Sequence, residues 1–139
     1  DPMHESKEAM APNMRAVGEF WAQAADEIET HSDSALFGEQ TEAGLMPPAF
    51  QFSDDREEAT RMAREVLEGT RTKMSTPLKD FTDQGLALPA DGDMAIVCDG
   101  EGMPVALISD TSVKTEWPEG DPEAKEVVEK FMVLFHLPN

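Results

Sequence analysis

The chain has 139 residues, of which 40% are hydrophobic and 29% charged, and its formal net charge is -18. Because single cores begin to split only in chains of roughly 250 residues or more, one domain over residues 13–139 is expected, preceded by a flexible N-terminal stretch over residues 1–12. The negative charge argues against a DNA footprint, a broad nucleic-acid surface or an anionic membrane surface, since like charges repel.

The first half of the chain predicts two amphipathic helices. From residue 15 to 28 apolar residues recur at spacings of three and four, which is the helical period. Residues 31–44 have little periodicity and indicate a loop, and residues 45–52, with two consecutive prolines, indicate an extended segment. The second helix is predicted to be capped by Asp54 and to end at Gly69, because glycine readily adopts the left-handed conformation of a helix stop.

The second half predicts mainly strands, separated by a loop over residues 79–91. The expected strands cover residues 71–76, 93–98, 105–111 and 127–137. The second and third flank Asp99-Gly100-Glu101-Gly102, which is typical of a hairpin turn. The last strand is apolar at both odd and even positions, so burial on both faces is expected. Helices followed by strands favour an α+β domain with a small, mainly antiparallel sheet or barrel.

The sequence gives little support for a metal site, a reactive thiol or a membrane-spanning segment. The histidines His4, His31 and His136 show no ligand spacing to one another or to Cys98, so no metal and no cofactor are predicted. Cys98 lies in an apolar run, which favours a buried, inert thiol over a nucleophile. A single cysteine and the absence of any apolar run of roughly 18 residues predict a cytoplasmic protein without a membrane span.

Positive charge is concentrated in residues 56–79. This window holds six of the eleven basic residues and four acids, a charge of +2, so the rest of the chain carries -20. Within it, strand alternation places Arg71, Lys73 and Ser75 on one side, a donor-rich face suited to an anionic or carbonyl-bearing ligand. The alternatives are arginines that solvate a helix face and a strand edge kept soluble by its cations.

The same region resembles a known family. Residues 69–74 read Gly-Thr-Arg-Thr-Lys-Met, similar to a Gly-x-Lys-Thr-x-Thr motif, and Leu88-Pro89, Gly92-Asp93 and the segment 94–105 continue the likeness. Together they resemble the ASCH domain, whose fold is similar to the PUA RNA-binding barrel. The resemblance implies a small bacterial protein with a PUA-like, mainly antiparallel β-barrel flanked by helices, and an RNA- or nucleotide-binding cleft lined by the motif.

Some members of that family resemble amidohydrolases acting on acetylated cytidine and others ribonucleases, with the motif Lys, its second Thr and a downstream Glu as the implied catalytic residues. Here Arg71 and Met74 replace the first two, and Glu119 is the best match for the acid. Because arginine stays protonated and methionine has no hydroxyl, catalysis is not the leading expectation.

The leading hypothesis is a non-catalytic module that binds RNA or a small nucleotide-like ligand. Its expected contacts are Arg71, Thr72, Lys73, Ser75 and Phe81, the last standing where the family often has Tyr. One alternative is a hydrolase or ribonuclease in which Arg71 polarises a carbonyl and Glu119 is the acid or base. The other is an acidic interaction domain for a basic protein partner.

Overall fold

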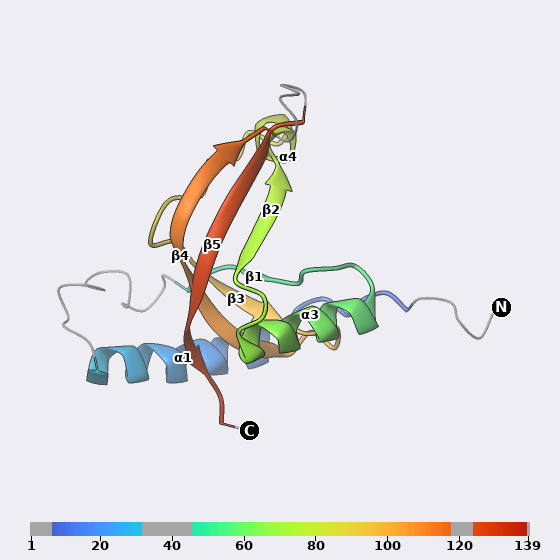
Figure 1. Cartoon of the computed structure of the whole chain (residues 1–139). Coiled ribbons are helices and arrows are strands. Elements are labelled where there is room, and N and C mark those ends of the chain that lie inside the picture. Colours follow the sequence, from blue (N-terminus) through green and yellow to red (C-terminus); the bar gives the residue numbers. More distant parts are fainter. Residues whose placement is uncertain (1–6, 32–45, 118–123, 139) are drawn as a thin grey trace. The chain divides into compact units, whose positions relative to one another are not determined.

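A computed structural model describes residues 7–31, 46–117 and 124–138, which contain three helices and five strands (Figure 1). These residues fall into two compact units. The first unit takes its residues from Asp1–Arg71, Met94–Ile108 and Val133–Asn139, and the second from Thr72–Asp93 and Ser109–Met132.

The first unit is built on helix α1, Met14–His31. The Asn13 side chain begins it by accepting a hydrogen bond from the Ala16 amide at 3.1 Å. Its apolar stripe, predicted from the sequence, packs into the core of the unit. That core consists of Val17, Phe20, Trp21, Ala24, Ile28, Ile96, Cys98 and Leu107. The helix prediction is therefore confirmed, with an extension at each end.

Helix α3, Arg56–Glu68, follows the short strand β1, Ala49–Phe50. Its N-cap is Asp55, whose carboxylate accepts a hydrogen bond from the Glu58 amide, so the predicted cap at Asp54 is wrong by one residue. The error arose because Asp54 and Asp55 are chemically equivalent as caps and only the backbone path selects one. Gly69 ends the helix with φ +83°, as predicted.

Strands β3, Met94–Cys98, and β4, Pro104–Glu116, form the predicted hairpin. Its turn is held by the N-terminal segment, since the Met10 and Asn13 amides donate to the carbonyls of Gly100 and Gly102 at 2.8 Å each. A Cβ atom at position 100 would lie 1.9 Å from a backbone oxygen of α3. Glycine is therefore required at position 100 by close approach of the backbone.

The second unit contains strand β2, Lys73–Pro77, helix α4, Leu78–Asp83, and most of strand β5, Glu126–His136. The predicted loop over residues 79–91 is wrong at its start, where α4 lies. A six-residue helix that follows a proline and buries no residue leaves almost no periodic signal to detect. Figure 1 shows α4 directly at the end of β2.

From Val127 to Met132 strand β5 is buried on one face only, whereas the sequence predicted burial on both; beyond it, Leu134 and Phe135 are both half-buried against the first core. Val127, Glu129 and Phe131 are buried, while the alternating Lys130 and Met132 are exposed. Apolar residues on both faces do not require two covering layers, because a single methionine tolerates exposure on the solvent face of a strand.

The strand order is β1-β3-β4-β5-β2, with β1 parallel to β3 and β2 antiparallel to β5. The chain therefore has an α+β fold with a five-stranded mixed sheet. Strands β1 and β2 are the two end strands of this order, and they do not pair with each other among the described residues. No helix among the described residues is long and apolar enough to cross a bilayer.

Candidate functional site

The segment predicted to form the site, Gly69 to Ser75, is divided between the two units, since the first ends at Arg71 and the second begins at Thr72. The sequence analysis had grouped these residues as one site only because they are adjacent in the chain.

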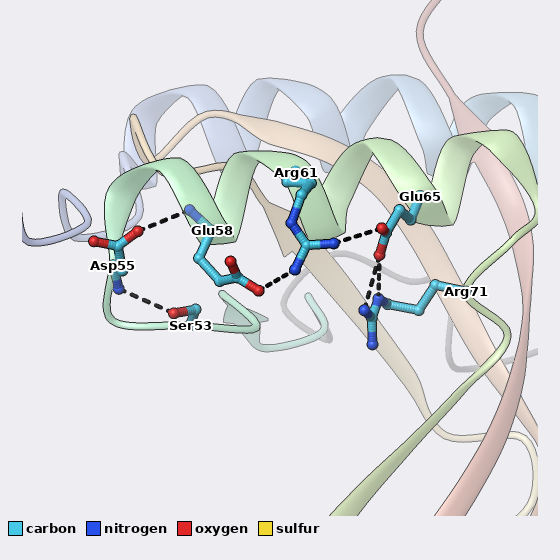
Figure 2. Close-up of polar contacts among 6 residues, drawn as sticks. All are labelled: Ser53, Asp55, Glu58, Arg61, Glu65 and Arg71. Atoms are coloured by element: carbon cyan, nitrogen blue, oxygen red, sulfur yellow. Dashed lines mark hydrogen bonds and ion pairs between the residues drawn. The ribbon is translucent and has the colours of Figure 1, made fainter. Parts of the chain in front are cut away.

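Arg71 is held in the first unit by a carboxylate and an aromatic ring. Its Nε and Nη2 atoms donate to Oε1 of Glu65 at 3.0 and 2.8 Å, as Figure 2 shows. The guanidinium also lies over the Phe52 ring, 5.6 Å from the centroid. The hydrogen bond from Arg71 is the main reason why the pKa of Glu65 is lowered from its ordinary value. Arg71 is thus engaged by the protein itself.

Other cations of the positive window are also paired with acids. Arg61 bonds both Glu58 and the second oxygen of Glu65 on the surface of α3 (Figure 2). Arg56 lies 3.9 Å from a carboxylate oxygen of Glu101. These contacts support the alternative in which arginines stabilise a helix surface, and they reduce the local positive field that the sequence predicted.

The exposed face of β2 presents a different arrangement. Lys73 and Ser75 are exposed and Met74 is half-buried, so the predicted alternation holds from Lys73 onwards. In the register of β2 with β5, Lys73 lies directly opposite Lys130, whose side chain is also exposed. Side chains at such paired positions start about 5 Å apart, and like charges placed there destabilise a sheet. No ion pair to either lysine occurs in the part of the chain that the structure describes.

Lys130 was missed by sequence reasoning, because the strand register that brings it to Lys73 is not readable from one sequence. Thr72 is exposed just before β2, and its carbonyl accepts a hydrogen bond from the Phe131 amide at 2.9 Å. Phe81 is half-buried on α4, which packs against β2. Glu119, the expected acid, lies outside the described residues.

A second feature absent from the sequence predictions is a pair of buried acids, Asp110 on β4 and Glu129 on β5. They are only 6% and 8% exposed, and their carboxyl groups share a hydrogen bond. Burial, followed by the bond to Asp110, raises the pKa of Glu129 to about 8. Burial also raises the pKa of Asp110, with added repulsion from Asp93 and Asp91.

The signal for this pair was present in the sequence. Glu129 stands between Val127 and Phe131 at period two, which is the inward-facing position of a strand, and an acid there contradicts the apolar pattern. Asp110 likewise ends the apolar run of its own strand. A buried acid demands a partner or a proton, so such a break in the pattern was itself informative.

Cys98 is buried in the first unit, and burial raises the pKa of its thiol to about 11. A neutral thiol in the core has the inert character that the sequence predicted. Among residues 7–31, 46–117 and 124–138, no three His, Cys, Asp or Glu side chains gather as a metal-binding group.

Comparison with solved structures finds neighbours of the same fold, two of which are described here. A crystal structure of a protein from Enterococcus faecalis V583, with the family model DUF984, has a TM-score of 0.70 and 21% sequence identity, covering 86% of this chain and 88% of that one. An ASCH domain from Lactobacillus crispatus JV V101 has a TM-score of 0.69 and 17% identity, covering 88% of this chain and 96% of the other. No family model and no curated protein matches the sequence.

At these identities the likeness concerns the fold. The five-stranded mixed sheet with its helices is an ASCH-like α+β fold, which confirms the fold class that the Gly69 to Val113 region led us to expect but not the closed barrel.

Proposed function

We propose that this chain is a binding module for a small nucleotide-like ligand, recognised through its phosphate by the exposed lysines Lys73 and Lys130. The observation that carries the proposal is their placement directly opposite each other on β2 and β5. In a chain with 29 acidic and 11 basic residues, two exposed lysines without an ion pair among the described residues form an unusual local concentration of positive charge. A phosphate bound between them removes their mutual repulsion.

The neighbouring donors extend the same surface. Ser75 lies two residues after Lys73 on the exposed face of β2, and a hydroxyl there supplies a further hydrogen bond to a phosphate or a carbonyl. Thr72 is exposed at the start of the strand. The ring of Phe81, on the helix that follows β2, offers an apolar surface for a base. The ASCH-like fold is consistent with this reading, and the closed barrel that the resemblance implies stays a prediction.

Arg71 has a more restricted part in the proposal. Glu65 accepts from Nε–H and from one Nη2–H, so a ligand anion in the first unit must use the remaining donors on Nη1 and Nη2 or displace the carboxylate. We therefore assign the leading role to Lys73 and Lys130 and treat Arg71 as a separate candidate. The NMR resonance of the Arg71 Nε–H group shows ligand binding at Arg71 independently of binding at the two lysines.

The test is a titration of ¹⁵N-labelled protein with nucleosides, nucleotides and short RNAs, followed by amide chemical shifts. Nucleotides are expected to shift the Lys73, Ser75 and Lys130 amides, and nucleosides to do so weakly, because they lack the phosphate. RNA that binds more tightly than mononucleotides identifies RNA as the ligand. No shift near Lys73 with any of these probes overturns the proposal.

The matched variants are Lys73→Ala and Lys114→Ala, each of which removes one exposed lysine from a strand of the second unit. Loss of one charge-assisted hydrogen bond is expected to weaken nucleotide binding about tenfold in Lys73→Ala. Lys114→Ala is expected to bind like the wild type. Equal losses in both variants indicate a diffuse charge effect instead of a site.

Two other outcomes point to the alternative functions. Release of acetate from acetylated cytidine, lost in Arg71→Ala, favours the hydrolase. Salt-sensitive binding to a basic protein, unchanged in Lys73→Ala, favours the acidic interaction domain, for which the net charge of -18 is the supporting observation.

A further inference from the structure

The buried acids Asp110 and Glu129 take no part in the proposed ligand contacts. They lie on neighbouring strands, β4 and β5, within the second unit, and their side chains are less than a tenth exposed. Neither acid forms an ion pair with a cation among the described residues. Two ionised carboxylates buried on neighbouring strands repel each other without compensation, so this arrangement favours retention of one proton by the pair.

The charged surroundings favour retention of that proton. The segment before β3 contributes Asp91 and Asp93, both acids that act on the pair. The Asp93 carbonyl accepts from the Asp110 amide at 2.8 Å, which fixes this segment alongside β4. From β2, the residue opposite Glu129 is the uncharged Met74, and the flanking Lys73–Lys130 pair lies on the exposed alternate positions of the two strands.

We propose that the Asp110–Glu129 pair is a proton-operated latch: one shared proton ties β4 to β5, and loss of that proton weakens this pairing and, with it, the hold of β5 on β2. The second part follows from the register, because Glu129 is the pairing partner of Met74 within the β2–β5 ladder. When both acids are ionised, two adjacent negative charges are buried without compensation. The proton then leaves to solvent and no other group changes.

The direction of the pH dependence follows from linkage. In the unfolded or opened chain both carboxyls have ordinary acidic pKa values, whereas in the closed unit the pKa of Glu129 is about 8. The closed state therefore holds one more proton between these values, and its stability falls as pH rises through this range. Above pH 8 both states have lost the proton and the dependence levels off. The consequence that ligand binding at Lys73 weakens with rising pH rests on the proposed function.

The experiment measures amide hydrogen exchange of the full chain by NMR between pH 5.5 and 9, as protection factors corrected for intrinsic rates. Phe131, whose amide donates to Thr72, reports on the second unit, and Ile96, whose amide donates to Pro48, reports on the first. The latch predicts that protection at Phe131 falls by up to about tenfold per pH unit to pH 8, with a smaller change at Ile96. Equal pH dependence at the two amides overturns the latch.

Two variants separate this effect from general acid titration. Glu129→Gln retains a donor for Asp110 but does not titrate, so the pH dependence at Phe131 is expected to disappear. Glu116→Gln removes an exposed carboxylate of β4 and is expected to retain it. If Glu129→Gln fails to fold, the ¹³C carboxyl shift of Glu129 in the wild type decides. A titration midpoint near its ordinary value overturns the latch. None of these measurements requires a ligand, so they stand or fall separately from the proposed function.

Discussion

At the scale of single residues, the contrast between Arg71 and Lys73 shows how neighbours in sequence acquire different chemistry. Arg71 is paired with Glu65 and lies over Phe52. Lys73 on β2 instead lies opposite Lys130 on the neighbouring strand β5. The sequence predicted one donor-rich face for both. Since partners that lie far apart in sequence decide which cation is engaged, residue type and spacing were not enough to distinguish them.

The Arg71–Glu65 contact is tested by the titration of Glu65. In Arg71→Lys the fork of donors is lost, so the pKa of Glu65, now lowered mainly by that hydrogen bond, is expected to move up toward its ordinary value. The contribution of this pair to stability is present at neutral pH and is lost as pH falls through the lowered pKa. The ¹³C carboxyl shift of Glu65 measures the change. Arg64→Lys, an exposed position on α3, is the control, and an equal shift there contradicts the assignment.

Cys98 offers a prediction about reactivity. Burial raises the pKa of its thiol to about 11 from an ordinary 9, which lowers the thiolate fraction at pH 8 by about a hundredfold. Reaction with Ellman's reagent is therefore expected to be at least about a hundredfold slower in the folded protein than in guanidinium chloride. A rapid reaction of the folded protein contradicts the burial of this residue.

At the scale of elements, local sequence patterns predicted the structure correctly where more than one feature indicated the same element. The apolar stripe of α1 repeats over several turns, and the stop at Gly69 and the turn between β3 and β4 each combine a periodic segment with a glycine. They failed where a single short signal had to decide, as with α4 and the cap of α3. The burial of β5 on one face depends on what packs against it, which no local pattern contains.

The N-cap of α3 gives a prediction with a built-in control. Asp55→Ala removes the carboxylate that accepts the Glu58 amide at 2.9 Å and is expected to lower the free energy of unfolding by about 1 kcal/mol. Asp54→Ala removes an adjacent carboxylate for which the structure shows no side-chain bond in the described part of the chain. It is expected to change stability by less than about 0.5 kcal/mol. Urea unfolding measures both, and the reverse order contradicts the cap assignment.

At the scale of the whole molecule, the net charge of -18 competes with the ion pairs on the surface of α3. Exposed pairs are each worth less than about 1 kcal/mol, and salt screens both the pairs and the overall repulsion. With 18 more negative than positive charges, we expect the repulsion to dominate.

Salt is therefore expected to stabilise the protein. Raising NaCl from 20 to 300 mM is predicted to increase the melting temperature by about 3–5 °C, the equivalent of about 1 kcal/mol for a chain of this size. Differential scanning calorimetry measures it, with sucrose of equal osmolality as the control for exclusion effects. A fall in melting temperature shows that the α3 pairs outweigh the repulsion.

The two tryptophans of the chain lie one in each unit, and their surroundings differ. Trp21 is 7% exposed in the first core, whereas Trp117 is 54% exposed with the Lys125 ammonium 4.6 Å from its ring centroid. Each unit therefore carries its own intrinsic fluorophore, one shielded from acrylamide and one open to it. Single-tryptophan variants, with phenylalanine at the other position, make it possible to follow the melting of each unit separately and to learn whether they unfold in one cooperative transition.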